Sequence, residues 1–337
     1  MSRFPSLHDR AEAALLGLAI GDALGMPTQS MSREQIARTY GTIRGLVDAV
    51  SDQPIAPLMP AGTITDDTEQ ALLLGELLIA GDGRIEPRGF ADALADWERG
   101  MEAKGSRDLL GPSTKAAIAA IQGGATPEDD PGRGGTTNGA AMRITPVGIA
   151  FPPDRLLPAV ADASRLTHNT GLGLSAAAAV GMAVSYALEH PDATMPDVVA
   201  VAAEAADALA GTGNWAAGGA VGPRIRWAAE AVAGLDAAAA LEFVADVVGT
   251  SVASQESVPA VFALISRFGD GPYATLLHAT ALGGDTDTMA AMAGAVLGAL
   301  HGRHAWPGEV ADRVLSINDL DLRTLVDGLL GLRHAAA

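Results

Sequence analysis

Small apolar residues at helical spacing dominate this chain. Residues 8–24, HDRAEAALLGLAIGDAL, have apolar spacing typical of a helix, with small residues that permit close packing. Residues 289–300, MAAMAGAVLGAL, are rich in Ala, Leu and Met and predict a buried helix. The uncharged run 172–188 also predicts a buried helix, because it is shorter than the roughly 20 apolar residues of a bilayer span. Strand-like alternation is scarce, so the pattern predicts an all-α protein.

The rest of the pattern extends the same prediction. Further helical patterns cover 69–80, 88–100 and 113–122, several Ala-rich stretches within 192–282, and two closing helices within 307–333. Gly and Pro predict a long surface loop at 41–63 and an irregular segment at 123–132. A fixed repeat of roughly 30 to 45 residues, as in a solenoid, is not visible. We therefore predict one compact domain, without an internal boundary, over residues 1–337.

Two short acidic motifs stand at the starts of predicted helices. They are TDDT at 65–68 and GGDTDT at 283–288, where the Gly pair lets the backbone turn tightly. Asp and Thr are favoured N-cap residues, and Asp66 with Glu69 matches a capping box. A cap needs one acceptor, whereas each motif offers several, and a cation at a helix N-terminus needs clustered carboxylates to outweigh the dipole. Both readings, helix caps and a cation site, are therefore open.

The candidate ligands are all oxygens. They are the carboxylates of Asp66, Asp67, Asp285 and Asp287 and the hydroxyls of Thr65 and Thr288. Hard oxygen sites favour Mg²⁺ or Mn²⁺, with Ca²⁺ possible, whereas zinc prefers His or Cys. Adjacent residues on a helix point about 100° apart, so Asp66 and Asp67 can serve two ions, or one ion and a water.

Four motifs identify a family. GDALG at 21–25, TDDTE at 65–69, NGAAMRI at 138–144 and GGDTDT at 283–288 occur in this order. Together they resemble the signature of the ADP-ribosylglycohydrolases, which include dinitrogenase-reductase-activating glycohydrolases and ADP-ribosyl-acceptor hydrolases. The resemblance covers nearly the whole chain. It implies an orthogonal helical bundle that binds two Mg²⁺ or Mn²⁺ ions at the second and fourth motifs.

The resemblance also implies a reaction. An N- or O-glycosidic bond is cleaved at the anomeric carbon of an ADP-ribosyl group, carried by a protein or a small molecule. A metal-activated water can attack a carbon with oxocarbenium character, while the ribose hydroxyls complete the shell of an ion. We assign Asp67, together with Asp66, the role of orienting or deprotonating that water.

Several residues are candidates for substrate binding. They are Gln29, Thr137, Asn138, Gly139, Arg143 and His168. Residues 134–140 are small and amide residues where a helix can begin, which suits an anion such as a diphosphate. Arg143 is a candidate phosphate partner, although an Arg on a helix is more often in a surface salt bridge. His168 resembles a His near the substrate cleft of the family, although a lone His is usually a polar residue at a helix junction.

Gln29 departs from the family pattern. In the resembling hydrolases, the loop after GDALG often carries a Glu where Gln29 stands. A Gln amide cannot act as a general base, but it can donate and accept hydrogen bonds to a sugar hydroxyl or a base edge. We therefore expect two metals to bind normally but ADP-ribosyl-arginine and ADP-ribosyl-serine to be hydrolysed slowly, the true substrate having a better leaving group.

Three other features have ordinary explanations. Residues 171–176, GLGLSA, fit a dinucleotide fingerprint, but no β-rich run precedes them, so we read them as small-residue helix packing. Gly21-Asp22, taken alone, predicts a C-cap and a turn near the end of the first helix. Trp215 is read as a surface or core filler rather than a residue stacked on a base.

Charge and composition restrict the partners and the compartment. The formal net charge is −18, from 22 basic and 40 acidic residues, which disfavours nucleic acid and anionic membranes. The absence of Cys excludes disulfides, thiolate catalysis and zinc–sulfur sites. The N-terminal sequence MSRFPSLHDR has no signal-peptide pattern, so we expect a cytoplasmic protein.

Two alternatives to an ADP-ribosyl hydrolase stay open. One is a metal-dependent N-glycosidase of a smaller nucleoside-like metabolite, which would need no grip on a diphosphate. The other is a non-catalytic helical binding protein, against which the four intact Asp ligands argue.

Overall fold

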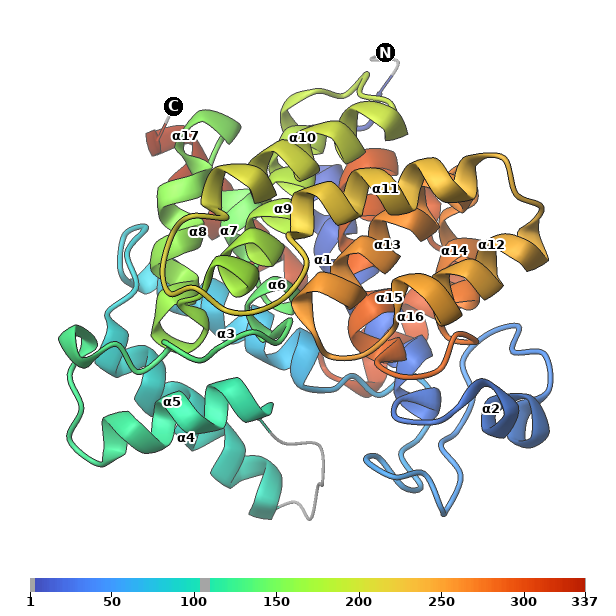
Figure 1. Ribbon diagram of the computed structural model, residues 1–337, viewed down its shortest axis with the longest axis horizontal. Helices are drawn as coiled ribbons and strands as arrows, with labels where there is room; N and C mark the ends of the chain where they lie inside the picture. The colour runs from blue at the N-terminus through green and yellow to red at the C-terminus, as the bar shows by residue number, and fades with distance from the viewer. Residues whose placement is uncertain (1–3, 104–109, 337) are drawn as a thin grey trace.

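The computed structural model describes residues 4–103 and 110–336 (Figure 1). The α-helices in these ranges are α1 (Leu7–Gly25), α2 (Arg33–Tyr40), α3 (Asp66–Ala80), α4 (Pro87–Ala103), α5 (Pro112–Gln122), α6 (Gly139–Met142), α7 (Thr145–Ala150), α8 (Pro153–His168), α9 (Gly171–Glu189), α10 (Met195–Leu209), α11 (Val221–Ala233), α12 (Ala237–Phe243), α13 (Ser254–Phe268), α14 (Pro272–Ala279), α15 (Thr286–His301), α16 (Gly308–Ile317) and α17 (Leu322–Ala336). Short helical turns are η1 (Met26–Thr28), η2 (Pro127–Asp129), η3 (Val244–Val248) and η4 (Arg303–Ala305). Within the described ranges no strand forms, and two isolated bridges join Thr137 to Ala253 and Thr170 to Asn214. The predicted all-α domain is confirmed.

Helices α1 and α15 lie at the centre of the domain, and their backbones are in direct contact. A Cβ atom added at Gly17 would lie 2.2 Å from the carbonyl oxygen of Gly294, and one added at Gly21 would lie 2.0 Å from that of Ala290. A Cβ on Gly298 would meet the carbonyl oxygen of Ala13 at 2.0 Å. Larger side chains at these positions would push the helices apart. The small residues of the sequence pattern therefore set the distance between two helices that both lead into the site.

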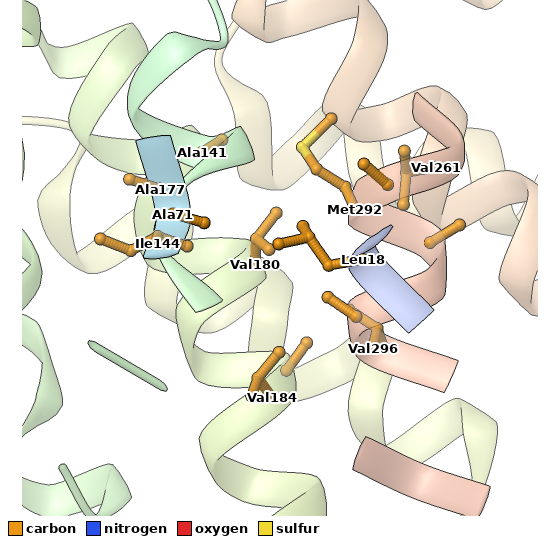
Figure 2. Packing of buried hydrophobic residues seen from close by; sticks show 14 of the residues in the cluster. Leu18, Ala71, Ala141, Ile144, Ala177, Val180, Val184, Val261, Met292 and Val296 are labelled. Carbon is orange, nitrogen blue, oxygen red and sulfur yellow. The ribbon is translucent and has the colours of Figure 1, made fainter. Parts of the chain in front are cut away.

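The other helices pack around this pair. Figure 2 shows Leu18 of α1, Met292 and Val296 of α15 and Val180 of α9 meeting in one apolar cluster. These four side chains are fully buried. Helices α4 and α5 lie together at one edge of the domain, and α2 lies at another (Figure 1). The core thus supports the starts of α3 and α15, where the acidic motifs are found, and that of α6, which carries the NGAAMRI motif.

Helix α9 is apolar enough to cross a membrane by length and composition, and it is the one such helix in the described ranges. In the fold, 83% of its most apolar window is buried inside the protein, as expected for a core helix. The fingerprint-like residues at its start serve packing, because a Cβ on Gly171 would lie 2.4 Å from the carbonyl oxygen of Ala210. No strand leads into α9 in the described part of the chain, which agrees with the prediction of helix packing.

One local expectation changes. Gly21 and Asp22 do not end the first helix; they lie inside α1, which continues to Gly25. Gly21 is needed for contact with α15 rather than for a turn. The predicted loop at 41–63 contains no helix, as expected. Trp215 has 88% of its surface exposed, which places it at the surface and not in the core.

Candidate active site

The N-terminal end of α3, the helix mouth formed by residues 65–68, is held by the carboxylate of Asp22 from α1. The carboxylate of Asp22 accepts hydrogen bonds from the hydroxyls of Thr65 and Thr68, at 2.7 and 2.5 Å, and from both of their backbone N–H groups. The capping box suggested by Asp66 and Glu69 does not form. Thr65 is the N-cap without a side-chain cap bond, and Glu69 instead accepts from the indole Nε1 of Trp97. The acids of α3 are therefore not used to cap their own helix.

The mouth of α15 begins with the glycine turn. Gly283 and Gly284 have φ values of +76° and +77°, which only Gly adopts readily, and a Cβ on Gly284 would lie 2.3 Å from the carbonyl oxygen of Thr250. Thr286 anchors the turn because its hydroxyl lies 3.0 Å from the carbonyl oxygen of Gly25 and 2.9 Å from the hydroxyl of Thr28. The N-cap, Asp285, makes no side-chain cap bond. This motif, too, is held from the end of α1.

The fold brings the two motifs together. The hydroxyl of Thr288 donates to Asp67 Oδ2 at 3.2 Å across 221 residues of sequence. Asn138 Nδ2, at the start of α6, donates to Asp285 Oδ2 at 2.6 Å. Gln70 Nε2 donates to Asp66 Oδ2 at 2.8 Å. Each of these three carboxylates thus has one oxygen oriented by a neutral donor of the chain, as is usual for carboxylates that bind a metal.

Burial and mutual repulsion make this cluster electrostatically unfavourable without a cation. Burial raises the pKa of Asp67 well above its usual range, and the charges of Asp287, Asp66, Asp22 and Asp285 raise it further. Burial also raises the pKa of Asp22 to about 6, although its hydrogen bonds from Thr68 and Thr65 oppose the shift. The pKa of Asp285 is raised by burial and lowered in part by hydrogen bonds from Asn138, Thr288 and Asp287. A nearby cation would favour the ionised form of all of these carboxylates.

The residues fit a divalent cation. Asp67 Oδ1 is buried and has no hydrogen-bond partner in the chain, and an ion would compensate that oxygen. Within 4–103 and 110–336, no group of three or more His, Cys, Asp or Glu side chains is arranged to hold a metal by itself. Hydroxyl oxygens of Thr65 and Thr288, water and substrate would therefore have to complete the ligand shell of a divalent ion.

A cavity of about 190 Å³ opens beside these groups. Its lining includes the predicted residues Gln29, Asp66, Thr137, Asn138, Gly139, Asp285, Asp287 and Thr288. Thr65 and Asp67 lie beneath it with at most 1% of their surface exposed. The structure thus places four predicted substrate residues and four predicted metal ligands around one cavity.

Arg143 and His168 do not line this cavity. Neither side chain has any exposed surface, so contact with a substrate phosphate or with a bound substrate is not open to them in this structure. His168 ends α8 and lies between the hydroxyls of Thr137 and Thr167, as a polar residue at a helix junction does. Arg143 is also not in a surface salt bridge, because it is enclosed in the core. Between them, the two residues are joined by hydrogen bonds to Gln70, Thr137 and Thr167.

The expected diphosphate cradle at 134–140 is weaker than its sequence indicates. The helix that follows, α6, is only one turn long. The N–H of Asn138 donates to the carbonyl oxygen of Val252, and the N–H of Gly135 donates to that of Gly132. Gly135 serves packing, since a Cβ there would lie 2.2 Å from the carbonyl oxygen of Thr167. At least two of the expected N–H donors are therefore already used within the chain.

Sequence reasoning missed the residues that support the site. Gln70, Thr28 and Thr167 carried no signal, because ordinary polar residues in a helix or turn are not distinctive. Asp22 stood in the GDALG motif, but its position within a single helix does not show which distant helix its carboxylate caps. An Asp in an otherwise apolar helix was the available signal, because a buried carboxylate needs donors from elsewhere in the chain.

Comparison with known proteins agrees with this picture. The family model for ADP-ribosylglycohydrolase matches residues 4–336. An uncharacterized protein of Escherichia coli K12, YegU, is 31% identical over 332 residues, covering 97% of this chain and 98% of that protein. The ADP-ribosyl-[dinitrogen reductase] glycohydrolase of Rhodospirillum rubrum is 35% identical over 185 residues, covering 54% of this chain and 59% of that enzyme. A solved structure described as an ADP-ribosylglycohydrolase-related protein complex superposes with a TM-score of 0.69 at 25% identity, covering 98% of this chain and 99% of that one.

Proposed function

Because the chain belongs to the ADP-ribosylglycohydrolase family, we propose that it is a metal-dependent hydrolase that cleaves the bond between an ADP-ribosyl group and its acceptor at the anomeric ribose carbon. The family consists of glycoside hydrolases and depends on divalent metal ions in general, which disfavours a non-catalytic binding protein. The observation that carries the proposal is the meeting of two acidic helix mouths at one cavity. A bound divalent ion would supply positive charge to the ribose oxygens and to an attacking water.

Each carboxylate has a role in this proposal. Asp66 lines the cavity with Oδ2 held by Gln70, so it is placed to orient a water or accept its proton. Asp67 is buried, and its Oδ1, which has no hydrogen-bond partner in the chain, would be available to a cation. Asp285, held by Asn138, and Asp287 also line the cavity. Burial raises the pKa of Asp67 and of Asp285, so a nearby cation would favour their ionised forms.

The size of the cavity supports a second candidate. At about 190 Å³ it is smaller than the ~300–1,000 Å³ typical of ligand pockets, so it suits the sugar end of a substrate. The two N–H groups of the 134–140 segment that bond within the chain cannot bind a diphosphate. Both observations favour hydrolysis of a smaller nucleoside-like metabolite as the alternative. In either case we propose a cytoplasmic enzyme whose substrate is neither nucleic acid nor membrane.

The test is a substrate panel with and without metal. ADP-ribosyl-arginine, ADP-ribosyl-serine peptides, O-acyl-ADP-ribose and free nucleosides are incubated with the protein in Mg²⁺, Mn²⁺ or EDTA, and released ADP-ribose or ribose is measured. We expect metal-dependent release from at least one ADP-ribosyl compound and none with Asp285→Asn. Release from nucleosides alone would select the second candidate, and equal release in EDTA would contradict metal dependence.

A further inference from the structure

Arg143 is a cation enclosed in the core directly behind the cavity. It has no exposed surface, and its guanidinium lies over the ring of Phe90, 5.1 Å from the centroid. Nη1 donates to Gln70 Oε1 at 3.2 Å and Nη2 donates to Thr167 Oγ1 at 2.5 Å. Both of these partners are uncharged. A buried cation is costly when it is not fully paired, so these two hydrogen bonds need an explanation beyond stability.

Two series of hydrogen bonds, or arms, start at Arg143. The arm that starts at Nη2 has a defined donor-to-acceptor direction. A guanidinium only donates, so Thr167 Oγ1 accepts from it, and the proton of Thr167 is directed to its other partner, His168 Nδ1, at 2.8 Å. Nδ1 is then the acceptor nitrogen, and Nε2 carries the hydrogen of the neutral ring. Nε2–H donates to Thr137 Oγ1 at 3.0 Å, and the hydroxyl of Thr137 donates to Ser113 Oγ at 2.9 Å. This arm ends at a residue that lines the cavity.

The arm that starts at Arg143 Nη1 is directed in the same way, because a guanidinium only donates hydrogen bonds. Because Arg143 donates to Gln70 Oε1, the Nε2 end of the amide must face the opposite way. Nε2 donates to Asp66 Oδ2 at 2.8 Å. Gln70 is itself 1% exposed, so solvent does not compete for its orientation. This arm ends on a carboxylate that lines the same cavity.

We propose that Arg143 is a positioning residue whose guanidinium sets the direction of every hydrogen bond between Asp66 and Thr137, and so holds His168 as the neutral tautomer protonated at Nε2. The permanent charge of Arg makes this direction independent of pH in the working range. The hydrogen-bond pattern belongs to the folded chain and does not depend on the reaction. Only its consequence, that one group orients both sides of the substrate cavity, rests on the proposed function.

The environment of His168 agrees with a neutral ring. Burial, and then the charge of Arg143, lower its pKa well below the usual value. A Cβ on Gly139 would lie 3.0 Å from His168 Cε1, so the loop packs directly on the imidazole. A change of tautomer would turn Nε2 from a donor into an acceptor and reverse its bond with Thr137. The loop that carries Thr137 is therefore sensitive to a proton position that Arg143 dictates.

The first test reads the tautomer directly. Long-range ¹H–¹⁵N spectra of the full-length protein with ¹⁵N-labelled His, assigned by the loss of one signal in His168→Gln, report which ring nitrogen is protonated. We expect a neutral His168 ring protonated at Nε2 at pH 7. A ring protonated at Nδ1, or a charged ring, would overturn the proposal whatever the activity of the protein.

The variant Thr167→Val tests the role of Arg143 without removing the buried charge. Val has the shape of Thr but has no hydroxyl to accept a hydrogen bond from Arg143 and donate one to His168 Nδ1. We therefore expect a mixture of tautomers at His168. The matched control is Ser164→Ala on the same helix, whose buried hydroxyl has no hydrogen-bond partner and should leave the tautomer unchanged. An unchanged tautomer in Thr167→Val means that Arg143 does not set it, and overturns the proposal.

The other arm is tested with Mg²⁺ alone. Gln70→Met keeps the bulk but removes the donor to Asp66, and we expect Mg²⁺ binding, followed by thermal shift, to weaken about tenfold with the tautomer unchanged. Arg143→Lys keeps a charge but not the planar fork, so both readouts should move together. Unchanged Mg²⁺ binding in Gln70→Met would overturn this arm. Absence of Mg²⁺ binding in the wild-type protein would instead contradict the proposed function.

Discussion

The mouths of α3 and α15 have nearly the same sequence but are held in different ways. At α3, Thr65 and Thr68 bond to a buried carboxylate, Asp22, which takes the place of a cap from within the helix. At α15, Thr286 bonds to neutral groups, the carbonyl of Gly25 and the hydroxyl of Thr28. The first mouth thus gains another acid, whereas the second gains none. Similar motifs can therefore present similar ligands while differing in the charge of their support.

The two supports have a common origin. Asp22 and Gly25 lie one turn apart near the end of α1, and α1 touches α15 through Gly21, where a Cβ would lie 2.0 Å from Ala290. A shift of this helix end would move both mouths together. The GDALG motif is thus best understood as the shared support of two ligand groups, with Gly for close approach and Asp for capping.

The largest expected effect comes from removing a carboxylate of either mouth. Asp285→Asn and Asp66→Asn should each lower turnover by at least about 100-fold and abolish most of the Mg²⁺ stabilisation, which amounts to about 2.7 kcal/mol at 100 times Kd. Turnover and melting temperature with and without Mg²⁺ are the measurements. Asp270→Asn and Glu76→Gln, which are exposed, remove the same charge elsewhere and should respond to metal like wild type. If the site variants do so as well, the metal binds elsewhere.

The support of Asp285 should matter next. Asn138 Nδ2 donates to Asp285 at 2.6 Å and to Ser257 Oγ at 3.0 Å. Asn138→Leu keeps the size of the side chain but removes this donor, so Mg²⁺ affinity or turnover should fall about 10- to 100-fold. Ser257→Ala removes only the neighbouring hydroxyl and is the matched control, with a much smaller expected loss. Equal losses in the two variants would show that packing, and not the orientation of Asp285, is what Asn138 provides.

A third experiment compares the supports of the two mouths. Asp22→Asn weakens four hydrogen bonds at α3 and should lower the free energy of unfolding by about 2 kcal/mol. Thr28→Val removes one hydroxyl at α15 and should cost about 1 kcal/mol. Urea unfolding of both variants in EDTA gives the comparison. A larger loss in Thr28→Val would reverse our assignment of the stronger support to α3.

The sequence predicted the helices and the candidate metal ligands better than it predicted the residues that hold those ligands in place. The helices were visible because small apolar residues recur at helical spacing, and the ligands were visible because acids crowd at two helix starts. The partner of Thr65 lies 43 residues away, and Gln70 reaches Arg143 across 73 residues. Such hydrogen-bonded pairs depend on how the helices pack in three dimensions, and the local sequence pattern does not show this packing. For the same reason, Arg143 was expected to meet phosphate but lies in the core.

A pH experiment tests whether His168, which bonds to Thr137 at the cavity, is neutral in the folded protein. The pKa of His168 is well below that of an unfolded His, about 6.5, so the unfolded chain binds one more proton as pH falls below 6.5. Stability should therefore decrease on acidification by about 1.4 kcal/mol per pH unit from this group. The difference between wild type and His168→Gln, measured by urea unfolding from pH 7 to pH 5, isolates this slope from other His residues. Parallel curves would mean that His168 is charged in the fold.

The smallest expected effect concerns Gln29, which lines the cavity between the two mouths. The residue is 6% exposed and its side-chain Nε2 has no hydrogen-bond partner in the chain, while its backbone carbonyl oxygen accepts a hydrogen bond from Gln53 Nε2 at 2.9 Å. The bond from Gln53 holds the backbone of this loop, and the buried amide Nε2 of Gln29 has no partner from the chain next to the cavity. Gln29→Glu would add another buried acid to the cluster, so the metal-free protein should lose about 1 kcal/mol of stability through repulsion between like charges.

With saturating Mg²⁺ this loss should shrink, because the cation compensates the added charge. Turnover of ADP-ribosyl-arginine or ADP-ribosyl-serine should rise several-fold, less than the ~10²–10⁴ of a well-aligned general base, since this loop has not been shaped around a carboxylate. Gln122→Glu, exposed at the end of α5, adds the same charge away from the cavity and should change neither property. If wild type already hydrolyses these substrates rapidly and Gln29→Glu gains nothing, the neutral amide does not limit the reaction, and a Glu at this position is not needed for it.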